Sequence, residues 1–178
     1  MTTESGKAAI KPAADEFAEY YGKYIDLVPK GNVVDNLRKQ MSQTRDLLAG
    51  LTEEQGNHRY EDGKWSIKEV IGHVIDCERI FAYRALRFAR NDQTPLPGFD
   101  QDGFAANGRF NERKLTDIAA EYSHVRQASI DLLEFMDESA WERRGLANES
   151  EISVRALAWI MSGHELHHIS AITSKYLT

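Results

Sequence analysis

Apolar residues recur at steps of three and four along four long stretches of the chain, the spacing of an amphipathic helix. The helices predicted from this pattern span about residues 32–51, 66–90, 111–136 and 153–176, with a shorter helical piece near 15–24. Ser66 and Glu69 have the spacing of an N-terminal capping box, and Ser153 is expected to cap the last helix. Alternating apolar and polar runs of useful length are absent. The pattern therefore predicts an all-α four-helix bundle.

The connection between the second and third predicted helices covers about residues 91–110, which is long for a compact bundle. Its prolines and glycines predict that it is not helical: Pro95, Pro97, Gly98, Gly103 and Gly108. A crossover loop of this length can join opposite ends of the bundle, which makes the two helices parallel. It can also form the roof of a pocket, because long ordered loops are often functional.

Length and composition exclude several classes of protein. A chain of 178 residues suits one domain, of which residues 1–14 are expected to be a flexible N-terminal segment. The net charge of −6 and the lack of a basic cluster argue against a nucleic-acid partner. The longest apolar run, Ala156–Met161, is too short to span a membrane, and the first residues lack a signal-peptide core. With Cys77 as the single cysteine, we expect a cytoplasmic protein without disulfides.

Histidines are the candidate functional residues, and three of the six fall between positions 164 and 168. His164 and His168 are four residues apart, so they share one face of the last helix. Leu157, Ile160 and Met161 lie on the same face, which directs both imidazoles into the bundle. Two buried imidazoles without partners are costly. A divalent metal ion resolves that cost, and the alternative is a hydrogen-bonded pair.

A third protein ligand with one open position would give such a site catalytic potential. His73, in the middle of the second helix at the edge of its apolar arc, is the best candidate. His58 and His124 lie in polar surroundings and are weaker candidates, and His167 lies on the flank of the ligand face.

The side chains next to the candidate histidine ligands each have more than one possible role. As a thiolate, Cys77 could complete the coordination and make the site structural, or it could be a small buried hydrophobic residue. Asp76 and Glu78 could accept hydrogen bonds from ligand N–H groups, or they could lie on a solvated face. Residues 164–168 also match the H-E-x-x-H pattern of zinc proteases, with Glu165 as base. The ten residues after His168 contain no third ligand for that site, which disfavours a peptidase.

Four segments resemble, in order, the signatures of the DinB/YfiT-like superfamily: GKWSIKEVIGHVID at 63–76, ERIFAYRALRFAR at 78–90, LPGFD at 96–100 and GHELHH at 163–168. The resemblance covers about residues 20–177. It implies a four-helix bundle with a long crossover and a metal site of His73, His164 and His168. It also implies homodimers. Family members include transferases that use thiols such as bacillithiol or mycothiol, and proteins described as metal-dependent hydrolases.

Three functional hypotheses follow. The leading one is a metal-dependent S-transferase that conjugates a low-molecular-weight thiol to a small electrophile. The second is a hydrolase in which the metal activates water and Glu165 or Asp76 is the base. The third is a non-catalytic stress-response or binding module with a structural metal. Imidazole ligands suit Zn²⁺, Ni²⁺, Cu²⁺ and Fe²⁺; we favour Zn²⁺, with Ni²⁺, Fe²⁺ or Mn²⁺ as alternatives.

Overall fold

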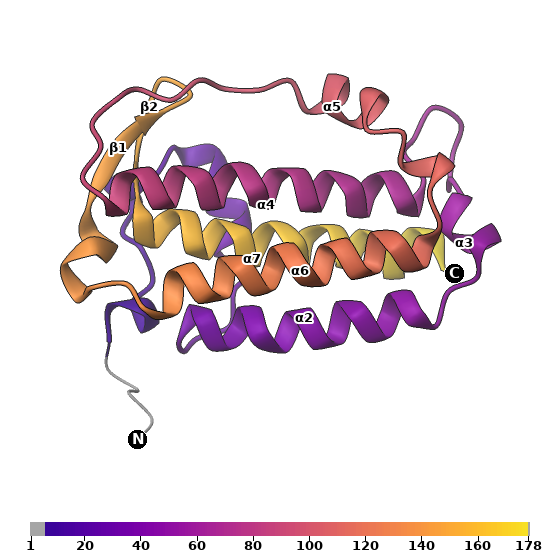
Figure 1. The fold of residues 1–178 in the computed structure, drawn as a ribbon, viewed down its shortest axis with the longest axis horizontal. Helices are drawn as coiled ribbons and strands as arrows, with labels where there is room; N and C mark the ends of the chain where they lie inside the picture. The colour runs from indigo at the N-terminus through magenta and orange to yellow at the C-terminus, as the bar shows by residue number, and fades with distance from the viewer. Residues whose placement is uncertain (1–5, 178) are drawn as a thin grey trace.

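Four long helices form the body of the protein in a computed structural model that describes residues 6–177 (Figure 1). They are α2 (Val33–Ala49), α4 (Ile67–Ala89), α6 (Leu115–Glu134) and α7 (Val154–Ala171). Each helix lies within a predicted range, which confirms the four-helix bundle. Beyond α7 the chain continues as a π-helical turn, Ile172–Tyr176.

The predicted helix caps are present. Ser66 Oγ accepts a hydrogen bond from the Glu69 backbone N–H at 3.2 Å, and Glu69 Oε2 accepts one from the Ser66 N–H at 2.8 Å. Ser153 Oγ accepts one from the Ala156 N–H at 2.9 Å. These bonds satisfy N–H groups that have no partner inside a helix, so both helices begin where the sequence indicates.

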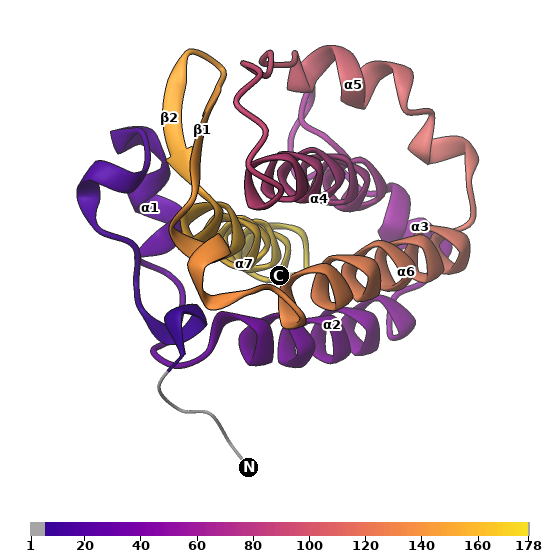
Figure 2. The ribbon, with the colours of Figure 1, turned by 60° about the vertical axis from the view of Figure 1, so that its left-hand side comes forward.

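The connection from α4 to α6 runs back along the bundle (Figures 1 and 2). Near its end, Asn111 accepts a hydrogen bond from Ser66 Oγ at 2.6 Å and donates one to Glu69 Oε1 at 2.8 Å. Because these bonds hold residue 111 at the beginning of α4, α6 starts at the same end and runs parallel to it. The prediction that the connection contains no helix was wrong: α5 spans Gln101–Asn107, with the Asp100 side chain as its cap.

A small β-hairpin is the second departure from the predictions. Strands β1 (Arg144–Ala147) and β2 (Ser150–Ser153) pair antiparallel around Asn148 and Glu149, which both have positive φ. The piece predicted near 15–24 is also broken, into two 3₁₀ turns and the short helix α1. The remaining elements are the 3₁₀ helices Lys7–Ala9, Ala14–Glu16, Glu19–Tyr21, Phe110–Glu112 and Glu138–Glu142 and the helices α1 (Gly22–Ile25) and α3 (Glu53–Asn57).

The N-terminal segment is in part attached to the bundle. Residues 1–5 of the segment expected to be flexible lie outside the described residues. Residues 7–9 form a 3₁₀ helix whose Ala8 is buried in the core. That part therefore packs against the bundle. Between residues 6 and 177, no helix combines the length and the apolarity that crossing a membrane requires.

Polar side chains divide the apolar core into two clusters. One cluster contains the second half of α4 and the first half of α7, from Cys77 and Val154 onward. The other contains the first half of α4 and the chain beyond α7, including Ile71 and Ile172. The layer between them holds buried polar residues, among which are Thr44, His73, Glu78, Arg126, His164 and Glu165.

Gly163 allows α1 to pack closely on α7, next to this polar layer. A Cβ atom at Gly163 would lie 2.0 Å from the carbonyl oxygen of Tyr24, which is closer than atoms can approach. The missing side chain thus brings the Tyr24 ring edge-on to the imidazole of His164, with ring centroids 5.3 Å apart. The glycine at position 163 thus determines which side chain packs against His164, a candidate metal ligand.

Candidate metal centre

Three imidazoles converge where α4 and α7 face each other. The Nε2 atom of His164 lies 3.1 Å from Nε2 of His73 and 3.1 Å from Nε2 of His168. The ring centroids of His73 and His168 are 4.9 Å apart. The structure therefore brings together the three histidines selected from the sequence, whereas His58, His124 and His167 are exposed.

The spacing of these nitrogen atoms fits one shared metal ion. Ligands at the usual zinc–nitrogen distance of about 2.0–2.1 Å stand roughly 3.3 Å apart in a tetrahedron. The observed separations of 3.1 Å are close to that value. Each neutral imidazole has one ring-nitrogen lone pair, and a divalent ion placed among the three Nε2 atoms can accept all three lone pairs at once. The donor set therefore suits a divalent ion.

Burial keeps these imidazoles neutral, which is the form that binds metal. It lowers the pKa of His73 to about 4, and the charge of Asp102 opposes this shift only weakly. It lowers the pKa of His168 to about 3, and the neighbouring histidines add to the effect. The pKa of His164 is also well below its ordinary value, chiefly through burial. At neutral pH all three lone pairs are available.

Cys77 lies one helical turn after His73 and belongs to the same cluster. Its Sγ is 3.6 Å from both ring nitrogens of His73. Single ligand atoms of Cys77, His73 and His164 all lie within 4.8 Å of one another, which is compatible with a common metal ion. Burial raises the pKa of the thiol to about 12, so the free side chain is protonated at neutral pH.

Glu165, expected as a base, faces away from the imidazoles and is occupied by other partners. Its Oε1 accepts hydrogen bonds from Thr44 Oγ1 at 2.6 Å and Tyr122 Oη at 2.5 Å. Its Oε2 accepts one from Arg126 Nη1 at 2.6 Å. Both carboxylate oxygens are thus engaged in a buried network, so this placement gives Glu165 a structural role and does not support the expectation of a base.

Arg126 is the centre of this network and was not singled out from the sequence. Its fully buried guanidinium binds Glu165 and, through Nε and Nη2, Glu78 at 2.6–3.0 Å. Glu78 was expected near the ligand N–H groups or on a solvated face, and the structure corrects both expectations because this carboxylate is paired in the core. The only sequence signal for Arg126 was its position inside the predicted third helix.

Two aspartates, Asp76 and Asp102, remain as acidic groups that could act on the imidazoles. Asp76 faces Arg79, with 3.7 Å between carboxylate and guanidinium, and burial raises its pKa. It forms no hydrogen bond with the three imidazoles in the described part of the chain. Asp102, on α5, lies near enough to His73 for its charge to act on that imidazole. No sequence pattern indicated a role for Asp102, because only folding places α5 over α4.

A cavity of about 170 Å³ opens beside His164 and Cys77. Its lining combines aromatic and polar side chains from α1, α4, the crossover and the hairpin: Tyr20, Tyr21, Tyr24, Phe81, Arg84, Gly98, Phe99, Gln101 and Asn148. The connection between α4 and α6 had been expected to form the roof of a pocket, and its Phe99 does line this cavity. The cluster therefore has direct access to a small, partly aromatic pocket.

Residues 36–172 match the sequence model of the DinB superfamily, which covers well over half of the chain. This chain belongs to the DinB superfamily. The match includes all three convergent histidines, so the family resemblance and the geometry concern the same part of the molecule.

Three relatives carry the name "Putative metal-dependent hydrolase". A protein of Oceanobacillus iheyensis is 23% identical over 82% of this chain and 88% of its own length. A protein of Geobacillus thermodenitrificans is 27% identical over 78% of this chain and 79% of its own length. A protein of Bacillus licheniformis is 28% identical over 78% of this chain and 80% of its own length.

Two solved structures share the fold. YfiT from Bacillus subtilis, described as "a probable metal-dependent hydrolase with an unusual four-helix bundle topology", has a TM-score of 0.66 and 17% identity. It covers 97% of this chain and 95% of its own. The mycothiol-dependent maleylpyruvate isomerase has a TM-score of 0.64 and 15% identity over 77% of this chain and 58% of its own. At these identities the likeness shows the fold alone.

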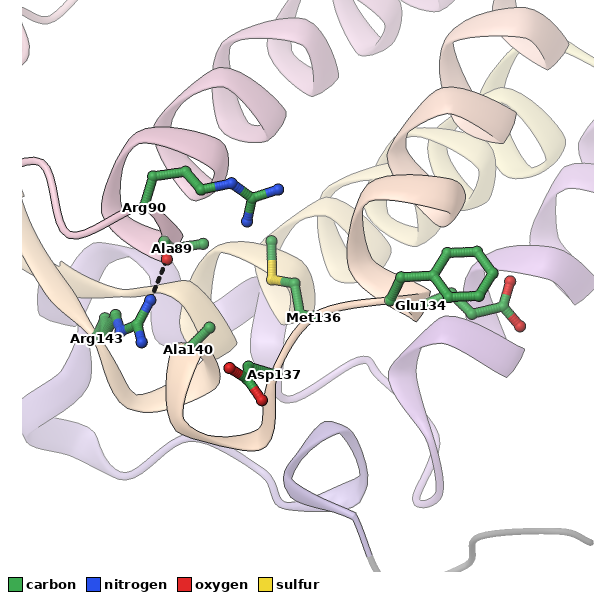
Figure 3. Close-up of a pocket in the computed structure, with 8 residues that line it drawn as sticks. Ala89, Arg90, Glu134, Met136, Asp137, Ala140 and Arg143 are labelled. Atoms are coloured by element: carbon green, nitrogen blue, oxygen red, sulfur yellow. Dashed lines mark hydrogen bonds between the residues drawn. The ribbon is translucent and has the colours of Figure 1, made fainter.

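This DinB-superfamily protein has a second hollow, of about 500 Å³, between the C-terminal ends of α4 and α6 (Figure 3). Arg143 reaches across it and donates a hydrogen bond to the carbonyl oxygen of Ala89. None of the eight residues around the hollow is a histidine or a cysteine. It therefore offers no comparable donor set for a metal ion.

The lowered histidine pKa values predict that the metal-free protein loses stability in mild acid. The unfolded chain has histidine pKa values near 6.5, so between about pH 4 and pH 6.5 it binds more protons than the folded chain. Stability therefore falls as the pH drops through this window, by about 1 kcal/mol per histidine from pH 6.5 to 5.5. Urea unfolding with a chelator present, at several pH values, measures this change.

The control for this prediction is the exposed His124 on α6. His124→Asn should leave the dependence on pH unchanged, whereas His73→Asn should make it shallower. Stability that is constant between pH 7 and pH 5 would contradict the prediction.

Proposed function

We propose that this chain binds one divalent metal ion through His73, His164 and His168 and transfers a low-molecular-weight thiol to a small electrophile. The observation that carries the proposal is the convergence of three neutral imidazoles, one of which, His164, lines an open pocket. No carboxylate completes the set among the described residues within reach of a shared ion. A site of this kind leaves the charge of the ion uncompensated, which favours an anionic ligand.

The chemistry that a bound divalent ion supplies here is to hold the thiol sulfur and to lower its pKa, so that a thiolate forms at neutral pH. In the transfer, a sulfur–carbon bond forms and the thiol proton is released; either a leaving group departs with the electron pair of its bond to that carbon, or a double bond to that carbon opens and the neighbouring atom takes up a proton. Tyr24 packs against His164, and burial raises the pKa of its hydroxyl group. It therefore stays protonated at neutral pH, and it shares a hydrogen bond with the Tyr20 hydroxyl at 3.2 Å on the wall of the pocket.

A hydrolase is the second candidate, and the names of three relatives favour it. Such a reaction uses a base that takes a proton from water. Both oxygens of Glu165 are bonded elsewhere, and Asp76 faces Arg79. Because neither expected base contacts the imidazoles, we rank the transferase above the hydrolase.

A structural metal is the third candidate, and the position of Cys77 favours it. A fourth ligand from this thiol would close the coordination sphere. Protein loaded with Co²⁺ distinguishes the cases, because a bound thiolate adds an intense sulfur-to-cobalt charge-transfer band. The transferase proposal expects no such band in free protein, the same spectrum for Cys77→Ser, and a new band when a thiol is added.

The experiment that tests the function uses full-length protein without a histidine tag. Metal content is measured first, and conjugation of bacillithiol or glutathione to 1-chloro-2,4-dinitrobenzene follows. We expect turnover that needs both metal and thiol. Metal-dependent cleavage of a nitrophenyl ester without any thiol would favour the hydrolase instead. Metal-free protein with unchanged thermal stability would favour a non-catalytic module.

The proposal also covers the partners, the oligomeric state and the cellular location of the protein. The partners are the thiol and a small-molecule electrophile, without nucleic acid or membrane. We propose a homodimer in the cytoplasm, which sedimentation analysis and cell fractionation can test.

A further inference from the structure

Arg84 lies on the wall of the cavity, on the same face of α4 as His73 and Cys77. Eleven residues separate His73 from Arg84, which is close to three full helical turns. The Arg84 side chain is 3% exposed, and its Nη2 donates a hydrogen bond to the carbonyl oxygen of Pro97 at 2.7 Å. A buried cation therefore shares a small pocket with the candidate metal ligands.

The charge of Arg84 has no carboxylate partner. Arg126, the other buried arginine of the described residues, forms ion pairs with Glu78 and Glu165 at 2.6 Å. Within residues 6–177, no carboxylate oxygen lies within 4.0 Å of the Arg84 guanidinium. The neighbouring Tyr21 is neutral at pH 7, since burial raises its pKa. An unpaired buried charge is costly, so the site is organised for a negative group that the described residues do not supply.

The roof over Arg84 is held in place by the hairpin. Leu96 donates its backbone N–H to the Leu146 carbonyl at 2.9 Å, and its own carbonyl accepts from the Asn148 N–H at 2.9 Å. Asn148 also packs against Gly98: a Cβ atom at position 98 would lie 2.1 Å from Oδ1 of Asn148. These contacts fix the Pro97 carbonyl that orients Arg84. The pocket is therefore formed before a ligand arrives, which favours binding.

We infer that Arg84 binds the carboxylate of a small aromatic or apolar acid, which makes the electrophile a carboxylic acid. That the acid is the second substrate of the enzyme rests on the proposed function. One unpaired positive charge matches one carboxylate, whereas a phosphate dianion would keep one negative charge uncompensated in a buried place. The aromatic walls formed by Tyr21, Phe81 and Phe99 suit the body of such a molecule.

The positions along α4 also fix the orientation of the substrate. Cys77 and Arg84 are seven residues apart, or about 10 Å along the helix axis. An acid whose carboxylate is held at Arg84 therefore directs its other end toward His164 and Cys77. This arrangement predicts that the reacting carbon lies at the end of the molecule away from the carboxylate.

Binding to metal-free protein tests the inference without requiring catalysis. The probes are phenylacetate and its neutral match phenylacetamide, each titrated into the protein and followed by NMR at low ionic strength. We expect the wild type to bind the acid about tenfold more tightly than the amide, as a charge-assisted bond allows. Arg84→Met should abolish this preference and Arg84→Lys should keep part of it. Arg87→Met, which removes a partly buried arginine of the same helix that is paired with Asp92, should leave it unchanged.

Thermal stability provides an independent measurement. If Arg84 serves a ligand, Arg84→Met keeps or raises the melting temperature, because it removes an unpaired buried charge. A lower melting temperature with an unchanged preference for the acid assigns Arg84 a structural role and overturns the inference. Equal binding of acid and amide by the wild type, binding of neither, or selective binding of inorganic phosphate overturns it as well.

The failure of this inference differs from failure of the proposed function. If the wild type and Arg84→Met bind Zn²⁺ equally but neither prefers the acid, only the inference is lost. If the wild type binds no divalent metal, the proposed function is lost, whatever the acid experiment gives.

Discussion

Replacing His164 and His168 together with alanine should abolish stoichiometric binding of a divalent metal, with affinity reduced more than 100-fold. The two imidazoles supply two of the three converging nitrogen atoms, and both come from one face of α7. Loss of a group that only hydrogen-bonds to a metal ligand costs about 10- to 100-fold in affinity, and the ligands themselves contribute more. Competition with a chromophoric zinc chelator measures the change. Metal-dependent activity should be lost with it.

A matched control is available on the same protein. The double variant His124→Ala, His167→Ala removes the same number of imidazoles from exposed positions. It should keep full metal affinity and activity. Circular dichroism should show both double variants folded, because the buried ion pairs of Glu165 do not involve these histidines. Full metal binding by the variant that lacks His164 and His168 would refute the site.

Replacing Arg126 with methionine should lower the free energy of unfolding by about 3–5 kcal/mol. The change leaves Glu78 and Glu165 in the core without their partner, although both carboxylates are almost completely buried. Uncompensated charges in such a place are far more costly than the packing lost with one side chain. Urea unfolding at neutral pH measures the difference.

Two further variants separate charge from size. Arg45→Met removes an exposed arginine paired with Asp46, and it should cost less than about 1 kcal/mol. Replacing Arg126, Glu78 and Glu165 together with apolar residues should recover most of the loss, because no charge then remains unpaired. A loss below 1 kcal/mol for Arg126→Met would show that water or movement of the helices relieves the two carboxylates.

The main body of the fold could be predicted from local sequence patterns. The bounds of α4 and α7 follow from their caps and apolar spacing, and the proximity of His164 and His168 follows from helix geometry. Prediction of α6 was less complete: Phe135, an apolar residue inside the range predicted for the third helix, lies just beyond the end of α6 and is 84% exposed. The true inner face holds Tyr122 and Arg126. Polar residues that pair across helices look like surface residues in the sequence.

The environment of the site depended on contacts between distant segments, so the sequence did not reveal it. His73 was selected as the best remaining ligand and by family resemblance, and helix geometry did not require it. The hairpin strands have four residues each, too few for a recognisable alternation. The cavity combines residues from position 20 to position 164. Its unpaired Arg84 becomes visible only when the surroundings of the side chain are known.

The division of α7 into two faces also affects how a protein of this kind can diverge. His164 lines the pocket, while the adjacent Glu165 binds Thr44 on α2 and Arg126 on α6 and so joins α7 to both helices. Substitutions on the pocket side can therefore alter metal preference or reactivity without changing the ion pairs that keep the bundle together. New activities can arise on this scaffold while its stability is inherited unchanged, which makes α7 a favourable starting point for directed evolution.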